Sequence, residues 1–191
     1  MVYLPNKYTM NFDSFSHGQI MSKLWLCEQL EPMISKNSTV FILGSWYNIL
    51  GSMMLTRNAN LYQSILGIDI DPNVIPVADK INETWIIEKK LTNITADANT
   101  YNLQGPNVII NCSPEHMDQT TWFDNLPTNT LICIQSISIV DDKEPWLIKQ
   151  PTPTYADFCM KYKLDKVHFS GIKSIQYANW GYERYMLIGE K

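Results

Sequence analysis

Three residues of this chain have the types and spacing needed to hold a nucleoside. Gly44 ends a short apolar run, Asp69 ends a second one, and Asp97 follows a third. A glycine lets the backbone approach a ligand closely, and a carboxylate accepts hydrogen bonds from both hydroxyls of a ribose. Asp69 follows Gly44 at close to the ~20-residue offset of ribose-binding acids. Asp97 is placed to accept from an adenine amino group.

Each of these residues also has a purely structural explanation. A tight turn after a strand needs glycine whatever the ligand is, and Asp97 alone suits a turn. Asp71, which precedes Pro72, is typical of a helix N-cap. We therefore assign the cap to Asp71 and the ligand contact to Asp69, with Ile70 packing on one face of the adenine. The combination of three such residues favours ligand binding.

The elements that must position these residues alternate along the chain. Short apolar runs predict strands, and apolar residues at helical spacing predict helices between them. Strands are expected at residues 39–43, 64–70, 90–96, 107–111 and 129–135. Helices are expected at residues 15–30, 48–57, 73–82, 118–125 and 154–161. Residues 166–177 and 182–189 predict an antiparallel hairpin.

Strands separated by helices predict an α/β fold. We expect a doubly wound, mostly parallel, seven-stranded sheet with helices on both faces, and the C-terminal hairpin adding an antiparallel edge strand. In such sheets, ligands bind beyond the carboxyl ends of the strands. We expect residues 1–191 to form a single domain, with residues 1–35 as a helical segment packed on it.

Composition excludes several classes of protein. The 191 residues include 15 Lys and Arg against 19 Asp and Glu, and 45% are hydrophobic. These values exclude a disordered chain and argue against nonspecific coating of nucleic acid. No apolar run approaches the ~18–20 residues of a membrane span, so we expect a cytoplasmic protein. The four cysteines are widely spaced, which favours free thiols over a metal site.

The segments at the strand ends resemble the class I S-adenosylmethionine-dependent methyltransferases. The resemblance lies in VFILGSW (residues 40–46), LGIDIDPNVIPVAD (66–79), ITADANTY (94–101) and VIINCSPEHM (108–117). It implies S-adenosyl-L-methionine as the cofactor and an antiparallel seventh strand beside the sixth. It also implies that Gly44 lies against the methionine part of the cofactor, Asp69 binds the ribose, and Asp97 with Ala98 contacts the adenine.

The first glycine turn departs from the family pattern at two positions. Ile42 stands where the family usually has an acid, and Trp46 replaces the second glycine. We therefore expect Ser45, the Trp46 indole and neighbouring backbone amides to hold the methionine end of the cofactor. Gln19 or Lys23 of the amino-terminal helix is expected to meet the cofactor carboxylate, with a solvated helix face as the alternative.

A polar cluster follows the fourth predicted strand. The Asn-Cys-Ser-Pro sequence that begins at Asn111 resembles the Asn-Pro-Pro-aromatic motif of amine-methylating members. Only Asn111 matches a functional residue of that motif. The resemblance implies that Asn111 orients the acceptor and borders the cofactor. Glu115 and His116 are candidate proton acceptors, because histidine titrates close to neutral pH. The alternative is that they open the next helix. Cys112 is expected to pack rather than to act as a nucleophile.

These residues predict a methyltransferase that uses S-adenosyl-L-methionine and no metal. A small molecule or a protein is favoured over nucleic acid as the acceptor, and no membrane partner or particular oligomeric state is predicted. Several aromatic residues are expected either to line an acceptor pocket or to belong to the core: Trp122, Trp146, Tyr155, Tyr177 and Trp180.

Three alternatives remain open. The first is an enzyme that uses the same cofactor for lysis or aminocarboxypropyl transfer, which the changed glycine turn suggests. A non-catalytic nucleoside-binding module is the second alternative. A nicotinamide-dependent oxidoreductase is disfavoured, because no Gly-x-Gly-x-x-Gly follows the first strand.

Overall fold

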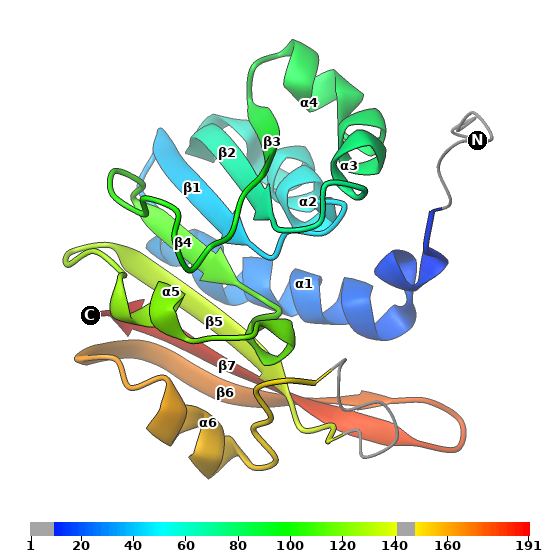
Figure 1. Ribbon diagram of the computed structural model, residues 1–191, viewed down its shortest axis with the longest axis vertical. Coiled ribbons are helices and arrows are strands. Elements are labelled where there is room, and N and C mark those ends of the chain that lie inside the picture. Colours follow the sequence, from blue (N-terminus) through cyan, green and yellow to red (C-terminus); the bar gives the residue numbers. More distant parts are fainter. Residues whose placement is uncertain (1–9, 141–147) are drawn as a thin grey trace.

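A seven-stranded sheet forms the centre of the computed structural model, which describes residues 10–140 and 148–191 (Figure 1). Its strands are β1 (Ser38–Leu43), β2 (Tyr62–Asp69), β3 (Leu91–Thr95), β4 (Val108–Asn111), β5 (Leu131–Ile137), β6 (Lys166–Gln176) and β7 (Gly181–Glu190). Their order is β3-β2-β1-β4-β5-β7-β6. Strands β1 to β5 pair in parallel, whereas β7 is antiparallel to both of its neighbours.

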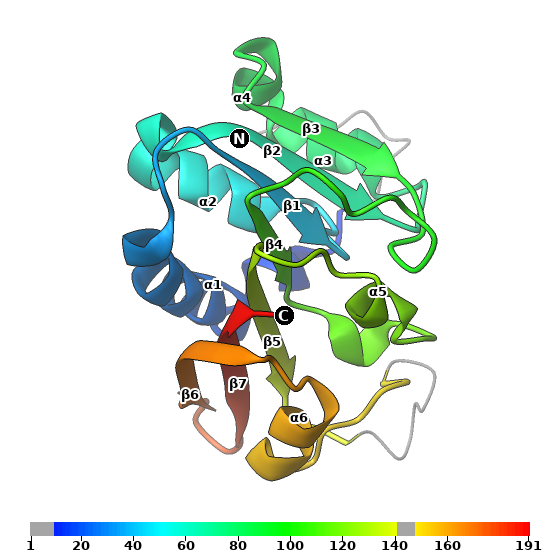
Figure 2. The same cartoon turned by 90° about the vertical axis from the view of Figure 1, so that its left-hand side faces the viewer.

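Helices cover both faces of this sheet (Figure 2). They are α1 (His17–Leu30), α2 (Ile49–Asn58), α3 (Ile75–Ile81), α4 (Glu83–Ile87), α5 (Thr121–Asp124) and α6 (Tyr155–Lys161). On one face, α1 and α2 bury Leu26, Leu30 and Met54 against the strands. On the other, α5 and α6 bury Trp122 and Phe158. No helix within residues 10–140 and 148–191 is long and apolar enough to cross a membrane.

The predicted fold class and the predicted strands are confirmed. All four residues of β4 are buried, as expected for a continuous apolar run between two helical layers. The short helix α4 was not predicted, and α1 begins at His17 because Ser16 caps it by accepting a hydrogen bond from the Gln19 amide. The expected antiparallel C-terminal hairpin is confirmed: β6 forms the edge of the sheet and pairs antiparallel with β7, which lies between β5 and β6.

The assignment of Asp71 as a helix N-cap is wrong. Helix α3 begins only at Ile75, after Val74, and has no side-chain cap. The Asp71 carboxylate instead accepts from the Asn73 backbone amide at 2.9 Å, which closes a turn between β2 and α3. The proline in the first turn of this helix is Pro76 and not Pro72.

Candidate active site

Two adjoining cavities lie at the edge of the sheet where the parallel strands end. Their volumes are about 360 Å³ and 70 Å³, and we call them the larger and the smaller cavity. Both are lined by Gly44 and Trp46 after β1, and by Ser113 and His116 after β4. A more open hollow of about 710 Å³ lies at the opposite edge, near Ser38 and Val108, where the strands begin. Because ligands of parallel sheets bind at the carboxyl ends, the two joined cavities are the candidate site.

The larger cavity brings together the residues predicted to hold a nucleoside. Asp69 and Ile70 line it from the end of β2, and Asp97 and Ala98 line it from the loop after β3. The Ile70 side chain is 64% exposed, which is unusual for a residue of this type and leaves an apolar surface at the cavity. Two carboxylates beside one apolar surface suit the hydroxyls and the flat ring of a nucleoside.

Asp69 already uses both oxygens within the protein. Oδ2 accepts from the Trp46 backbone amide at 2.7 Å, and Oδ1 accepts from the Asp71 amide at 3.0 Å. Burial raises the pKa of this carboxyl group, and the hydrogen bonds from these two amides oppose that shift. Each carboxylate oxygen can accept more than one hydrogen bond, so these contacts leave acceptor capacity for a ligand hydroxyl.

Asp97 also stabilises its own loop. Its Oδ1 accepts from the Asn99 backbone amide at 2.9 Å and from the Asn99 side-chain amide at 3.0 Å. Its carbonyl accepts from the amides of Thr100 and Tyr101. The turn explanation and the ligand explanation are therefore compatible, since the same aspartate closes a turn and lines the cavity.

The turn between β1 and α2 is held in an unusual conformation. Gly44, Trp46 and Asn48 all have φ between +50° and +60°. This left-handed region suits glycine at position 44, and an added Cβ there would lie 2.8 Å from Ser113 Oγ. The Ser113 hydroxyl donates to the Gly44 carbonyl at 2.9 Å, which ties the turn to β4.

Trp46 shows how a large residue replaces the usual glycine. Its backbone amide donates to Asp69, and its ring packs on Tyr47 with ring centroids 5.1 Å apart. A non-glycine residue in this region costs of the order of 1–3 kcal/mol, so neighbouring contacts must hold it there. Trp46 lines both cavities, so this residue lies where the two cavities meet.

Sequence reasoning missed a buried amide network under this turn. Asn48 caps α2 through Oδ1, which accepts from the Gly51 amide, and donates through Nδ2 to Asn93 Oδ1 at 2.8 Å. Asn93 in turn donates to Asp79 at 2.9 Å. Asn93 follows the apolar Leu91 at the two-residue spacing of one face of a strand, and this placement was the available signal, because buried polar side chains need partners.

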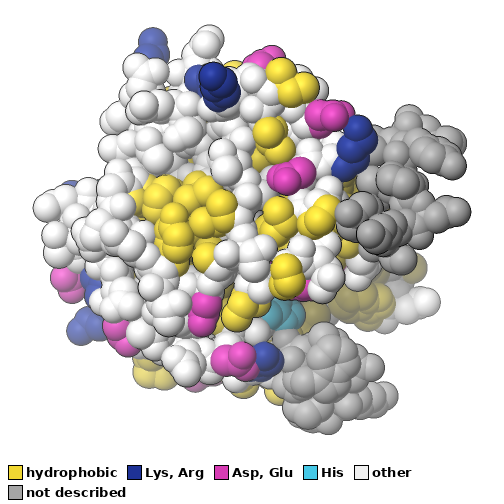
Figure 3. Space-filling model, turned by 45° about the horizontal axis from the view of Figure 1, so that its top comes forward, with side chains coloured by type: hydrophobic (Ala, Val, Ile, Leu, Met, Phe, Trp, Pro, Cys, Tyr) yellow, Lys and Arg dark blue, Asp and Glu magenta, His cyan; other side chains and the backbone are white. Residues whose placement is uncertain are grey.

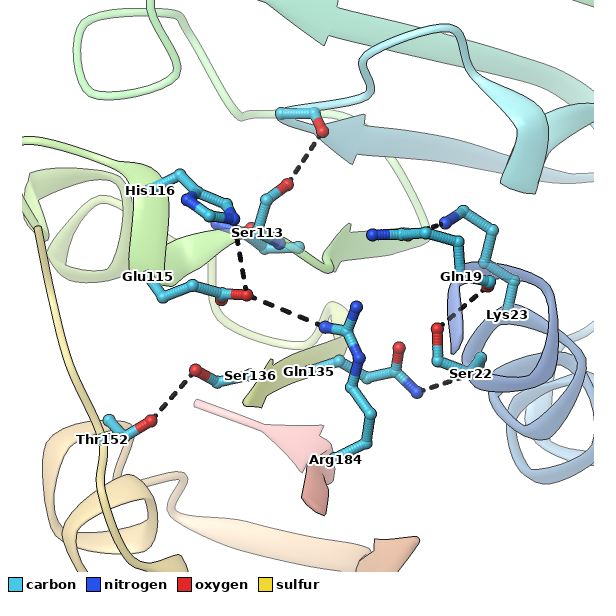
Figure 4. Close-up of polar contacts among 12 residues, drawn as sticks. Gln19, Ser22, Lys23, Ser113, Glu115, His116, Gln135, Ser136, Thr152 and Arg184 are labelled. Atoms are coloured by element: carbon cyan, nitrogen blue, oxygen red, sulfur yellow. Dashed lines mark hydrogen bonds and ion pairs between the residues drawn. The ribbon is translucent and has the colours of Figure 1, made fainter. Parts of the chain in front are cut away.

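The smaller cavity is lined by charged and polar side chains, several of which Figure 4 shows, together with apolar ones such as Ile42, Ile49 and Leu50. Gln19 and Lys23 enter it from α1, and the Lys23 ammonium donates to Gln19 Oε1. Burial lowers the pKa of Lys23 to about 8. Burial also raises the pKa of the Cys112 thiol to about 11, which keeps it protonated and agrees with packing rather than nucleophilic attack.

Glu115 and Arg184 form the buried end of this cavity. Glu115 is 2% exposed, and its Oε1 lies 3.7 Å from Arg184 Nη1 and 3.8 Å from His116 Nε2. Arg184 comes from β7 and was not among the predicted residues, although an arginine just before the apolar run of β7 was a visible signal. The His116 side chain is half exposed and lines both cavities.

Several predicted residues lie away from the two cavities. Asn111 is fully buried and lines neither cavity; its Oδ1 accepts from the Ser113 amide at 3.0 Å. Trp122 lies in the core, and Tyr177 stacks on Trp180 in the β6–β7 hairpin with ring centroids 4.5 Å apart. Tyr155 packs against Phe158. Trp146 lies outside the described residues.

Comparison with known proteins places this geometry in context. No protein-family model and no curated protein matches the sequence. Among solved structures, the chain is similar to the N-methyltransferase NodS from Bradyrhizobium japonicum in complex with S-adenosyl-L-homocysteine. The TM-score is 0.69 at 10% identity, covering 92% of this chain and 89% of NodS.

Two further solved structures show the same similarity. Geranyl diphosphate C-methyltransferase from Streptomyces coelicolor, also with S-adenosyl-L-homocysteine, has a TM-score of 0.64 at 8% identity, covering 90% of this chain and 78% of that one. A putative sarcosine dimethylglycine methyltransferase from Galdieria sulphuraria has a TM-score of 0.53 at 13% identity and covers 62% of this chain. This chain spans 46% of that protein's length. The chain thus has the fold of the class I S-adenosylmethionine-dependent methyltransferases.

Proposed function

We propose that this protein is a methyltransferase that uses S-adenosyl-L-methionine. The observation that carries the proposal is that Asp69 and Asp97 line one cavity beside Gly44, at successive strand ends. The fold is shared with proteins whose structures contain S-adenosyl-L-homocysteine, the product of that cofactor. We further propose that the chain works as a single domain, with its amino-terminal helical segment packed on the sheet.

The cofactor roles follow from the lining of the two cavities. Asp69 binds the ribose hydroxyls, Asp97 and Ala98 contact the adenine, and Ile70 packs on its ring. Ser45 and Trp46, after Gly44, border the methionine part. Gln19 and Lys23 receive its carboxylate, because Lys23 supplies a cation at the edge of the smaller cavity. When bound, the cofactor supplies an electrophilic methyl group.

The residues after β4 prepare the acceptor. Methyl transfer from a sulfonium needs an aligned acceptor and, for an amine, removal of a proton. Glu115 and His116 are the proton-accepting groups of the smaller cavity, and the half-exposed His116 gives the proton a route to solvent. Asn111 acts as a positioning residue, because it holds the Ser113 amide and Ser113 holds the Gly44 carbonyl.

The acceptor is a small molecule or a protein rather than nucleic acid. On the face seen in Figure 3, Lys and Arg side chains of the described residues lie apart from one another among Asp and Glu. Nucleic-acid binding relies on a continuous basic surface that neutralises phosphates. The formal charge of −4 points the same way.

Calorimetry with S-adenosyl-L-methionine and S-adenosyl-L-homocysteine tests the proposal. We expect both compounds to bind at one site per chain. Mass analysis of cofactor products then separates the reactions: methyl transfer yields S-adenosyl-L-homocysteine, whereas aminocarboxypropyl transfer yields methylthioadenosine. Absence of binding by either compound at millimolar concentration contradicts the proposal.

A further inference from the structure

Arg184 has a buried guanidinium group with unused hydrogen-bonding capacity. The residue is 4% exposed, and it lines the smaller cavity. Within the described residues, Nε and Nη1 have no hydrogen-bond partner. The Tyr182 side chain is the other neighbour of the guanidinium. Buried N–H groups without acceptors are costly, so a ligand or ordered water is expected to complete the two remaining nitrogens.

Glu115 has the complementary feature. Its Oε2 is buried and has no hydrogen-bond partner among the described residues. Its Oε1 lies 3.7 Å from Arg184 Nη1, which is longer than the ~2.7–2.9 Å of a charge-assisted hydrogen bond. The two groups balance each other's charge without bonding directly. Each therefore offers its unused atoms to a third group.

The groups that face this pair set the charge of the ligand. Lys23 faces it from α1, His116 lies beside Glu115, and the Cys112 thiol is uncharged at neutral pH because burial raises its pKa. Two permanent or near-permanent cations thus accompany one carboxylate. In the proposed function, Lys23 and Gln19 receive the carboxylate of the cofactor. Arg184 is then available to bind a second anionic group. The neighbouring Glu115 carboxylate is suited to bind an amine.

We propose that Arg184 and Glu115 recognise the acceptor, and that the acceptor is a small amine that also carries a carboxylate, such as a free amino acid. This inference rests on the proposed function. Arg184 holds the acceptor carboxylate, while Glu115 holds the amine through Oε2. The smaller cavity, about 70 Å³, suits a compact charged group.

The reaction balances with these residues alone. The acceptor ammonium loses one proton to the Glu115 carboxylate, which leaves a neutral amine. The amine nitrogen then donates its lone pair to the methyl carbon, and the carbon–sulfur electron pair stays on sulfur. The N-methylated product is again a cation. Glu115 passes its proton by way of His116 to solvent, so one proton is released for each methyl group transferred.

Paired acceptors test this proposal on the wild-type protein. Free amino acids and the corresponding decarboxylated amines, for example glycine with methylamine and ornithine with putrescine, are supplied at equal concentration with S-adenosyl-L-methionine. We expect kcat/KM for amino acids to exceed that for the matched amines by at least about tenfold, since a charge-assisted hydrogen bond is lost with the carboxylate. Equal rates, or no transfer to any amino acid in the panel, overturn the proposal.

Variants then distinguish a role of Arg184 in recognising the acceptor from a role in binding the cofactor. In Arg184→Gln we expect the preference for amino acids to disappear while S-adenosyl-L-homocysteine binds within about threefold of wild type; Arg184→Lys restores part of the preference. Lys163→Gln removes an exposed charge outside both cavities and leaves all values unchanged. A tenfold loss of S-adenosyl-L-homocysteine affinity in Arg184→Gln assigns Arg184 to the cofactor and overturns the proposal. If wild type does not bind S-adenosyl-L-homocysteine, the proposed function itself fails.

Discussion

Asp69 combines a structural and a ligand-binding task in one carboxylate. It fixes the strained Trp46 position through one oxygen and the start of the β2–α3 loop through the other. Both amides also orient the carboxylate towards the larger cavity, so the contacts that shape the turn prepare the proposed ribose contact. A residue with two such tasks cannot be replaced without affecting both.

Replacement of Asp69 with alanine is predicted to weaken binding of S-adenosyl-L-homocysteine by about 1–3 kcal/mol, because a charged hydrogen-bond acceptor is lost. Asp71→Ala is the matched control, since the Asp71 side chain bonds to Asn73 and does not line either cavity. Calorimetry of both variants measures the difference. An equal loss of affinity in the two variants would contradict the ribose role of Asp69.

The pKa of Lys23 predicts a pH-dependent stability. Burial lowers this pKa from 10.5 to about 8 in the folded protein, so between pH 8 and 10.5 the unfolded chain binds more protons. The free energy of unfolding contributed by Lys23 therefore rises with pH across this interval. Compared with wild type, Lys23→Met is expected to be more stable at pH 7, by about 1–3 kcal/mol, and to lose that advantage by pH 10.5.

Urea unfolding of wild type and Lys23→Met at pH 7 and pH 10.5 measures this effect. Lys163→Met is the control, because it removes a lysine whose side chain is exposed. A stability difference between Lys23→Met and wild type that stays constant over this pH range would show that Lys23 titrates normally.

At the scale of elements, the β1–α2 turn is the part that joins the fold to the site. It is bonded to β2 through Asp69, to β4 through Ser113, and to β3 through the Asn48–Asn93 contact. Three neighbouring strands thereby fix the one turn that separates the two cavities. The turn tolerates Trp46 because these bonds offset its backbone strain.

Asn48→Ala is predicted to destabilise the protein by about 2–4 kcal/mol. The change removes the N-cap of α2 and leaves Asn93 with a buried unpaired oxygen. Thr154→Ala, which removes the exposed N-cap of α6, should cost only about 1 kcal/mol. Chemical denaturation compares the two caps. Equal destabilisation would mean that the network under the turn contributes nothing beyond capping.

Sequence patterns predicted the elements well where local signals were strong. The apolar run of β1 and the glycine at its end are signals that lie within a few residues of each other, and they predicted the position of the β1–α2 turn. Helix α4 was missed because its five residues lie between two other elements and include no buried side chain. The Asn48–Asn93 and Glu115–Arg184 contacts join residues far apart in the chain, so only the sheet order reveals them.

At the scale of the whole molecule, the strand order brings the site residues to one edge. Because β1 lies between β2 and β4, Gly44 is flanked by Asp69 on one side and Ser113 on the other. The insertion of β7 between β5 and β6 carries Arg184 under α1, where it meets Glu115. Neither placement depends on any single side chain.

A ligand held by so many elements is expected to stabilise the entire fold. At a concentration of S-adenosyl-L-homocysteine 100 times its Kd, stability increases by about 2.7 kcal/mol, which corresponds to a rise in Tm of roughly 5–10 °C for a chain of this size. Thermal unfolding with and without the ligand measures the shift. NAD⁺ at the same concentration is the control, and a larger shift with NAD⁺ would favour the oxidoreductase alternative.

A crystal structure of the protein with S-adenosyl-L-homocysteine would show directly whether the larger cavity holds a nucleoside. We predict that the adenosine occupies the larger cavity, with its ribose hydroxyls within about 3 Å of Asp69 and its adenine against Ile70. A ligand bound elsewhere, or a ribose with no contact to Asp69, would show that these strand ends do not form the cofactor site.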